Sequence, residues 1–349
     1  MQFFPIFKTF MLAVAGGFLF YYLHIPLAWM LGPLTTVVLW TQVGKKSVCW
    51  PVNLRNTALI FLGYVIGKAF TATAAQQIVA QLPVMLVVTF SILLVSLVCG
   101  YVTHRQAGIS LASALMGSVP GGFSQMVLLS EEIENADMSV VSFMHTVRLL
   151  SVVFVVPYLA TQAATSTPSA IVVADAASST FFTFPTPDTL PLLAVAIVSA
   201  FIAKKICCPT PFLLGPILGT ALFSMNGIYC PPLPAWLTIL AQIAVGTYMG
   251  NGIQLASLTR WRILLASTML GVAVVLAMSL AVGYLLSSYY GYSNVTSFLS
   301  MAPGGVAEMS VTGIALHADL SAIASYQLFR LFFIMLLTPL MFRRWLKQE

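Results

Sequence analysis

The chain has 349 residues, of which 59% are hydrophobic and only 7% are charged. Soluble domains carry about 25% charged residues, so this composition excludes a soluble globular protein and indicates a polytopic membrane protein. The formal net charge of +6 comes from basic residues spread thinly between apolar runs. That pattern is typical of topology signals and not of a nucleic-acid-binding face.

The first half of the chain contains six apolar segments. A full helical crossing needs about 20 residues. The second segment is shorter and contains Leu31-Gly32-Pro33, which predicts a kinked or tilted helix. The fifth contains Pro120 and two glycines near its middle. The segments lie near residues 9–24, 26–41, 56–73, 83–103, 109–130 and 138–160.

The second half repeats the first. Leu31-Gly32-Pro33 recurs as Leu214-Gly215-Pro216, 183 residues later. Other glycines, prolines and arginines recur at that offset or, after a one-residue gap, at one residue less, which predicts an internal duplication. The matches pair Gly63 with Gly246, Gly67 with Gly250, Gly100 with Gly283, Pro120 with Pro303, Asp137 with Asp319, Arg148 with Arg330 and Pro157 with Pro339. The second set of apolar segments lies near residues 189–204, 211–226, 235–254, 263–287, 294–314 and 319–342.

We therefore expect a first membrane repeat over residues 1–160 and a second over residues 188–349. Residues 161–187 between them are rich in Ser, Thr, Ala and Pro and contain no Lys or Arg. This composition predicts an exposed linker on the periplasmic side.

Basic residues predict the orientation of each repeat, because Lys and Arg concentrate in cytoplasmic loops. In the first copy the basic loops follow the second and fourth segments, whereas in the second copy they follow the first and third. The two copies are therefore predicted to have inverted topology. The residues are Lys45, Lys46, Arg55, His104 and Arg105 in the first copy and Lys204, Lys205, Arg260 and Arg262 in the second.

Inversion requires an odd number of crossings per copy, and six segments are one too many. A fifth segment that forms a re-entrant hairpin removes the conflict and places both termini in the cytoplasm. The alternative is a miscounted short segment elsewhere, with the Pro-Gly-Gly helix crossing fully as a broken helix. Both versions predict an all-α polytopic membrane protein with two inverted repeats, about ten membrane-spanning helices and one broken or re-entrant segment in each repeat.

The duplicated Pro-Gly-Gly motif indicates a functional site. A proline and two glycines should break a helix, and a break inside hydrocarbon survives only where protein or a watery cavity surrounds it. The half-helix after the break directs free N–H groups into such a cavity, which suits an anion or a polar group. A packing kink is the structural alternative. The candidate residues are Ser118, Pro120, Gly121, Gly122, Ser124 and Gln125 in the first copy and Ser300, Pro303, Gly304, Gly305 and Glu308 in the second.

Glu308 takes the place that Gln125 has in the first copy, inside an apolar segment. Intramembrane carboxylates are costly and by default suggest an ion or proton site. The group could bind a coupling proton or hold a cation. The structural alternatives are an ion pair with Arg330 or Arg148 and a position near the membrane interface.

Arg148 and Arg330 occupy equivalent places in the last helix of each copy, where the helical rise puts them near the middle of the membrane. A guanidinium at that depth needs an acceptor: Glu308, helix-end carbonyls or an anionic substrate. His145 and Gln327 lie one turn earlier on the same face. The structural alternative is a clamp that ties the last helix to the fifth segment.

Two other repeated features have structural explanations. Asp137 and Asp319 each precede an apolar helix and are expected to be N-caps. Gly63-x-x-x-Gly67 and Gly246-x-x-x-Gly250 are expected to be helix-packing motifs.

The twofold Leu-Gly-Pro and Pro-Gly-Gly-x-x-x-Met pattern covers nearly the whole chain and resembles the bacterial AbrB-type inner-membrane proteins, whose defining feature is this duplication. The resemblance implies a location in the bacterial inner membrane. Members of that family are labelled as ammonia monooxygenases or as regulators of gene expression. A small DNA-binding transition-state regulator bears the same name and is a different protein.

Three functions compete. A secondary transporter explains inverted halves, paired breaks and buried charges together: it would move a small anionic or polar solute by alternating access, coupled to protons or sodium. A monooxygenase should show clustered His or carboxylate ligands, which this sequence lacks. A regulatory membrane protein would act indirectly, by moving or sensing a metabolite. We expect a non-enzymatic protein without cofactor or metal, whose partners are a solute, a coupling ion (H⁺ or Na⁺), the lipid bilayer and a second copy of itself, but no nucleic acid.

Overall fold

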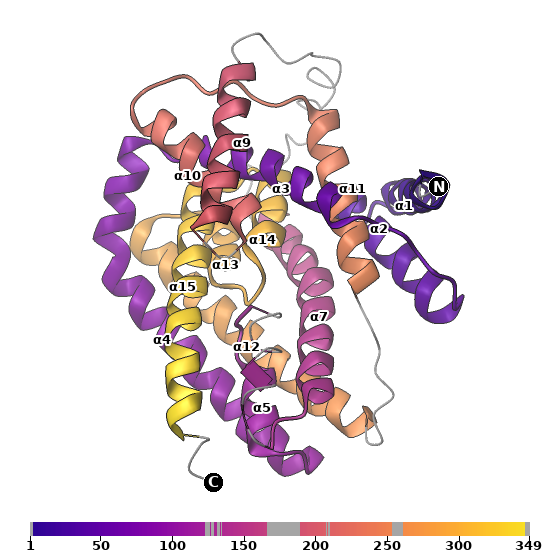
Figure 1. The fold of residues 1–349 in the computed structure, drawn as a ribbon. Helices are drawn as coiled ribbons and strands as arrows, with labels where there is room; N and C mark the ends of the chain where they lie inside the picture. The colour runs from indigo at the N-terminus through magenta and orange to yellow at the C-terminus, as the bar shows by residue number, and fades with distance from the viewer. Residues whose placement is uncertain are drawn as a thin grey trace. The chain divides into compact units, whose positions relative to one another are not determined.

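The computed structural model describes residues 3–345 apart from 123–125, 127–128, 131–132, 134, 166–188, 207, 209 and 253–260 (Figure 1). The described residues form helices and contain no strand. They divide into two compact units. Unit 1 comprises residues 1–79, 157–253 and 310–322, and unit 2 comprises residues 80–156, 254–309 and 323–349.

Unit 1 contains the first three helices of each sequence repeat. They are α1 (Phe3–Tyr22), α2 (Ala28–Val38), which continues into the π-helical segment η1 (Leu39–Val43), α3 (Val52–Gly67), α9 (Thr189–Lys205), α10 (Pro211–Met225) and α11 (Ala235–Gly252). α2 and α10 are short, as expected, and each continues through its proline, Pro33 or Pro216.

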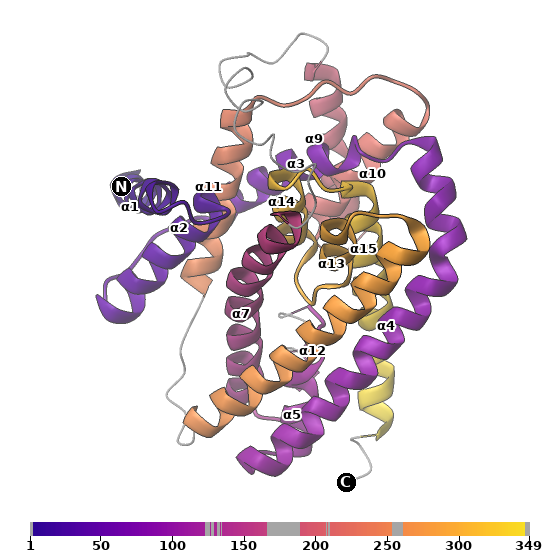
Figure 2. The same ribbon diagram turned by 180° about the vertical axis from the view of Figure 1, so that it is seen from behind.

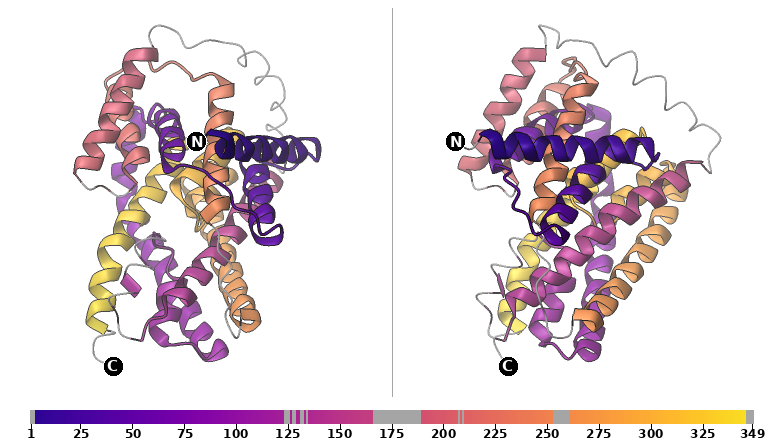
Figure 3. Two further views of the ribbon diagram at one scale, coloured as in Figure 1. Left: turned by 45° about the vertical axis from the view of Figure 1, so that its right-hand side comes forward. Right: turned by 90° about the vertical axis from the view of Figure 1, so that its right-hand side faces the viewer.

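Small residues let the helix backbones of unit 1 touch. A Cβ atom added at Gly63 of α3 would lie 2.7 Å from the carbonyl oxygen of Leu213 in α10, and one added at Gly246 of α11 would lie 2.3 Å from that of Met30 in α2. Both Gly-x-x-x-Gly motifs are therefore packing motifs, as expected. Within each repeat, α1 packs on α2 (Figure 3) and α9 packs on α10. Across the repeats, α3 packs on α10 and α11 on α2.

The backbone also repeats its left-handed residues. Leu27, immediately before α2, has φ 53°, and Thr210, immediately before α10, has φ 45°. Gly108 and Gly291, which are likewise 183 residues apart, have φ 63° and 71°. A positive φ is uncommon for residues other than glycine. Residues with positive φ recur 183 residues apart, which is the spacing of the sequence repeat. The two copies therefore share local backbone geometry as well as residue types.

Unit 2 contains most of the later helices of both repeats. They are α4 (Ala72–Ala107), α5 (Leu111–Ser118), α7 (Met138–Thr165), α12 (Trp261–Tyr290), α13 (Asn294–Met301), α14 (Val306–Ala315) and α15 (Leu320–Trp345), of which α4, α7, α14 and α15 also contribute residues to unit 1. α4 begins eleven residues before the expected segment, because the helix continues through Pro83. α7 likewise extends to Thr165, past the expected start of the linker; residues 166–188 of that linker lie outside the described chain.

The equivalent helices α4 and α12 run antiparallel in unit 2 (Figure 2). Near one end, the side-chain amide of Gln81 donates to the hydroxyl of Tyr292 at 2.8 Å, just beyond the end of α12. Farther along α4, the Cys99 Sγ atom lies 4.0 Å from the carbonyl oxygen of Gly271, early in α12. The N-terminal part of α4 thus lies beside the C-terminal end of α12, and the C-terminal part of α4 lies beside the N-terminal part of α12.

Both Pro-Gly-Gly motifs break their helices, as predicted. α5 ends at Ser118 and α13 at Met301, immediately before the two breaks, and α14 resumes at Val306. The backbone N–H of Asp137 donates to Ser113 Oγ at 2.7 Å, so the start of α7 lies beside the first turn of α5. Asp137 also caps α7, since its Oδ1 accepts from the N–H of Ser139 at 2.8 Å.

Five of the described helices are long and apolar enough to cross a membrane: α1, α4, α7, α12 and α15. They indicate a membrane-embedded protein. The ten-crossing arrangement would also need α2, α3, α9, α10 and α11, which have 11, 16, 17, 15 and 18 residues, short of the about 20 of a full crossing. That number therefore stays a prediction.

Candidate functional site at the two helix breaks

The two broken segments are built alike. α5 is capped by Ser110, whose Oγ accepts from the N–H of Ser113 at 3.2 Å, and α13 by Ser293, whose Oγ accepts from the N–H of Thr296 at 3.1 Å. After each helix the chain makes the same three-residue turn around the proline. The N–H of Gly121 donates to Val119 O and that of Gly304 to Ala302 O, both at 2.8 Å. The last carbonyl groups of both half-helices are thus left without a partner in their own helix.

An arginine from the last helix of each repeat supplies those partners. Arg148 Nη1 on α7 donates to Val119 O at 2.7 Å and to Ser118 O at 3.5 Å. Arg330 on α15, only 4% exposed, donates from Nη1 to Met301 O at 3.0 Å and from Nη2 to Gly304 O at 2.9 Å. Of the three acceptors expected for these guanidinium groups, the structure shows the helix-end carbonyls. The positive charge also complements the negative end of each helix dipole.

His145 and Gln327 complete the clamps in equivalent ways. His145 Nε2 lies 3.1 Å from Met116 O, and Nδ1 lies 2.8 Å from Arg148 Nη2. A carbonyl only accepts and a guanidinium only donates, so these contacts require a neutral imidazole with its proton on Nε2. Gln327 does the same with one amide: Nε2 donates to Leu299 O at 2.7 Å, and Oε1 accepts from Arg330.

This equivalence predicts which substitutions His145 tolerates. His145→Gln keeps one donor and one acceptor in the arrangement that Gln327 already uses, so the free energy of unfolding should change by less than about 1 kcal/mol. His145→Leu leaves a buried carbonyl and a guanidinium N–H without partners, and should cost about 2 kcal/mol. Unfolding of the purified variants in mixed micelles measures both. Equal losses for glutamine and leucine would contradict the matched roles.

The Glu308 carboxylate lies over the first turn of α14. A Cβ atom added at Gly305 would meet Glu308 Oε2 at only 1.9 Å, so this oxygen occupies the space that a side chain would need. Glu308 is the third residue of α14 and is half-buried. A carboxylate here interacts favourably with the positive end of the helix dipole. Its role as an ion or proton site stays a prediction.

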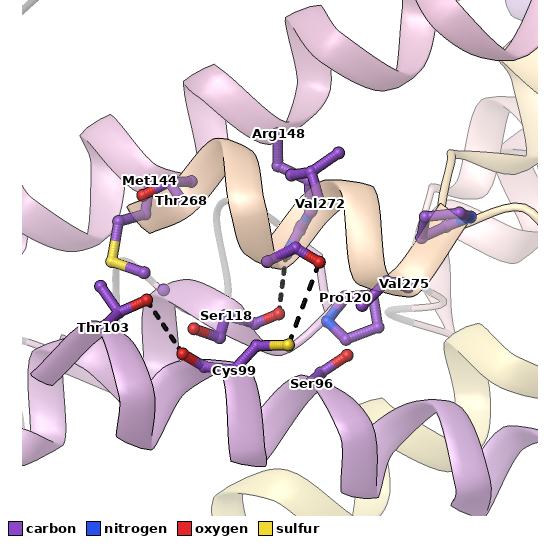
Figure 4. Close-up of a pocket in the computed structure, with 13 residues that line it drawn as sticks. Ser96, Cys99, Thr103, Ser118, Pro120, Met144, Arg148, Thr268, Val272 and Val275 are labelled. Atoms are coloured by element: carbon purple, nitrogen blue, oxygen red, sulfur yellow. Dashed lines mark hydrogen bonds between the residues drawn. The ribbon is translucent and has the colours of Figure 1, made fainter. Parts of the chain in front are cut away.

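A small cavity lies where the two breaks approach each other (Figure 4). Its volume is about 30 Å³, room for roughly two water molecules and far less than the few hundred cubic ångströms of a typical ligand pocket. Both break prolines line it, together with Ser118 and Arg148. The rest of its wall consists of Ser96, Cys99, Thr103, Gly117, Met144, Thr268, Gly271, Val272 and Val275.

Residues with hydroxyl or thiol groups lie along this cavity, although nearly all of its accessible wall is apolar. Ser96, Cys99 and Thr103 of α4 face it at helical spacing. From α12, the Thr268 hydroxyl is buried with no hydrogen-bond partner among the described residues. An unpaired buried hydroxyl costs about 1–3 kcal/mol of stability, so Thr268 carries such a cost beside the cavity.

The two halves differ at this point. The hydroxyl of Ser279 on α12, the equivalent of Ser96, lies 2.8 Å from Val275 O in its own helix and 3.1 Å from Met301 O at the second break. Ser96 donates to Ile92 O in its own helix and lines the cavity. Ser279 thus lies within hydrogen-bond distance of the break in its own repeat, whereas the bond described for Ser96 stays within α4.

The structure brings some of the predicted site residues together. Ser118, Pro120, Arg148 and Pro303 line the cavity, and Arg148, Arg330, His145 and Gln327 clamp the breaks. The hydroxyls of Ser118 and Ser300 donate to carbonyls one turn earlier in the same helix. Gly121, Gly122, Gly304, Gly305 and Glu308 lie at or just after the breaks and are not part of the cavity wall. Ser124 and Gln125 lie outside the described residues. Sequence analysis missed the α4 and α12 wall; the spacing of Ser96, Cys99 and Thr103 along one face of an apolar helix was the available signal. No three His, Cys, Asp or Glu side chains in the described chain come together to hold a metal ion.

The fold and the site together define a membrane-embedded helical protein with a duplicated helix break. The family described as "Transition state regulatory protein AbrB" matches residues 5–346, so the chain belongs to the AbrB family. The chain is 26% identical over 342 residues to "Putative regulator AbrB" of Escherichia coli (strain K12), covering 96% of this chain and 95% of that protein. It is 27% identical over 355 residues to "Uncharacterized protein YhjN" of Bacillus subtilis (strain 168), covering 95% and 91%.

Proposed function

We propose that this protein is a secondary transporter that moves a small anionic or polar solute by alternating access. One observation carries the proposal: two clamped helix breaks, one from each repeat, border the same small cavity. Transporters of inverted-repeat architecture bind their substrates where discontinuous helices meet near the middle of the membrane. A cavity of about 30 Å³ corresponds to a closed conformation, and alternating access would open it to either side.

The antiparallel pair α4 and α12 supports inverted repeats. These helices are equivalent in sequence, and two equivalent helices that run in opposite directions are what an inverted duplication produces. In unit 1, α3 of the first repeat packs on α10 of the second, and the equivalent helix α11 of the second repeat packs on α2 of the first. This reciprocal packing is also what two repeats related by a pseudo-twofold axis would show.

Contacts at the ends of the broken segments favour re-entrant hairpins. In the first repeat, α5 starts beside the start of α7, through Ser113 and Asp137. In the second, Gln81 bonds both Tyr292, just before α13, and Tyr326, in the second turn of α15. A segment that leaves and returns at the same end of a bundle does not cross it. Each repeat would then have five crossings.

The charges of the site indicate the class of solute. Arg148 and Arg330 bring two guanidinium groups to the breaks, and the nearby α14 N-terminus adds a positive dipole end. An anionic or polar group would be stabilised there. Glu308, half-buried in the first turn of α14, is the group that we assign to the coupling ion, a proton or sodium. The proposal involves neither an enzymatic reaction nor a cofactor.

Cys99 provides a direct test, because it lines the cavity. In a protein whose other cysteines are replaced by serine, an impermeant thiol reagent should modify Cys99 when applied from either face of oriented vesicles. A control protein that keeps only Cys49, in the loop before α3, should react from one face alone. Modification of Cys99 from one face only, or from neither, would overturn alternating access at this cavity.

The name of the Escherichia coli relative, a regulator, favours a second function, the indirect regulation of gene expression. Such a protein would act by moving or sensing a metabolite. The two functions separate in a Glu308→Gln strain: an expression change that persists after transport is lost would favour the regulator.

A further inference from the structure

A second hollow lies in unit 1, far larger than the cavity at the breaks. It is a groove of about 350 Å³ between α1, α3 and α11, and its wall is almost entirely apolar. We name it the α1–α3–α11 groove. Its side toward the surroundings is open, since Phe7 is 51% exposed and Leu240 is 40% exposed. The lining residues on α3 run from Leu54 to Phe61, about two helical turns.

One end of the groove is identified by Trp50. Its indole N–H donates to Ala244 O of α11 at 3.1 Å, and both residues line the groove. Next to Trp50, the backbone N–H of Cys49 donates to Thr9 Oγ1 at 3.3 Å, which brings this part of α1 to the same end. The opposite end is formed by apolar residues, among them Phe61 and Leu237.

Basic residues lie on the chain segments that adjoin the Trp50 end. The Nζ atom of Lys8 lies 5.7 Å from the centre of the Trp40 ring, and that of Lys46 lies 4.5 Å from it. Lys8 precedes Thr9 on α1, and Lys46 precedes Cys49 in the loop before α3, so the two lysines come from the two segments that the Cys49–Thr9 hydrogen bond joins. Arg55 follows the lining residue Leu54, and its guanidinium carbon lies 5.0 Å from the ring of Tyr248, one turn beyond Ala244. The groove therefore has an apolar body, and three basic residues, each close to a Trp or Tyr ring, lie on the segments next to its Trp50 end.

We propose that this groove binds one anionic phospholipid, with an acyl chain along α3 and the phosphate at Lys8, Lys46 and Arg55. Three features select this occupant. The open side faces what would be lipid in a membrane-embedded protein, Trp and Tyr rings lie close to the three basic residues, as is typical of the headgroup level, and basic residues attract anionic lipids. An entirely zwitterionic or uncharged lipid would use the apolar body but not the three basic residues.

The test is lipid binding by the whole purified protein in detergent. Native mass spectrometry during titration should show a 1:1 complex with dioleoylphosphatidylglycerol at least tenfold tighter than with dioleoylphosphatidylcholine. The double variant Lys46→Gln/Arg55→Gln should lose more than tenfold in affinity for phosphatidylglycerol and most of the preference. The matched control Lys204→Gln/Lys205→Gln removes the same charge from the end of α9, which does not line the groove, and should bind as the parent does.

A second variant tests the apolar body alone. Thr57 is exposed and lines the groove, so Thr57→Trp should shorten it without disturbing a buried residue, and binding of both lipids should weaken. Inorganic phosphate in tenfold excess should not displace the lipid. Equal affinity for the two lipids, or an equal loss in the α9 control, would overturn the proposal. The proposal would also be wrong if the protein formed a dimer without lipid and Thr57→Trp dissociated that dimer, because a second copy of the chain would then occupy the groove.

Discussion

Replacing Arg330 by methionine is expected to lower the free energy of unfolding by about 3 kcal/mol. Methionine fills similar space but donates no hydrogen bond, so Gly304 O loses the donor that the structure shows, and Met301 O is left with the Ser279 hydroxyl, which also contacts Val275 O. Gln327 Oε1 loses its donor as well. Hydrogen bonds from charged groups contribute about 1.5–3 kcal/mol each, and a buried carbonyl left unpaired carries its full desolvation cost.

Unfolding of the purified variants by titration with a denaturing detergent measures this change. Arg330→Lys keeps the charge but lacks the planar pair of donors that reaches two carbonyls, so an intermediate loss is expected. The control is Arg262→Met at the exposed start of α12, which should change stability by no more than about 0.5 kcal/mol. If Arg330→Met proved as stable as that control but no longer bound solute, the arginine would serve the solute and not the helix end.

Gly305→Ala is expected to reduce transport at least tenfold, as Glu308→Gln would. A methyl group at Gly305 would lie 1.9 Å from Glu308 Oε2, and the carboxylate must leave the first turn of α14 to make room. Because the carboxylate is the far end of a flexible side chain, the fold should survive while the position of the charge changes. The substitution therefore displaces the proposed coupling group without removing it.

The neighbouring glycine provides a matched control. A Cβ atom at Gly304 would meet Met309 Cε at 2.4 Å, the end of another flexible side chain, and would leave Glu308 in place. Gly304→Ala should therefore keep most of the activity. Uptake into proteoliposomes is the measurement, with the solute chosen from a thermal-shift screen of small carboxylates and phosphate esters. Similar losses in the two alanine variants would show that space at the turn, and not the carboxylate, limits transport.

Several features could be predicted from particular residues. The breaks followed from proline and paired glycines inside apolar runs, and the N-cap at Asp137 followed from an acidic residue before an apolar helix. The packing role of Gly63 and Gly246 followed from small residues one turn apart. These signals are local, because backbone sterics and helix capping act over a few residues.

Other features could not be predicted. The sequence left three acceptors open for Arg148 and Arg330, and the cavity wall on α4 and α12 was missed because its residues lie far from the breaks in the chain. α4 begins eleven residues before the expected segment of residues 83–103, and Pro83 lies inside the helix.

The sequence by itself determined the duplication, the membrane-embedded class and the positions of the two breaks, since composition and the residues that break helices act through solvation and local backbone geometry. Only the tertiary structure decided which groups satisfy the broken helix ends and that the two repeats differ at the cavity. Those outcomes depend on which helix carbonyls come within about 3 Å of a guanidinium or a serine hydroxyl, a distance set by packing between segments far apart in the chain.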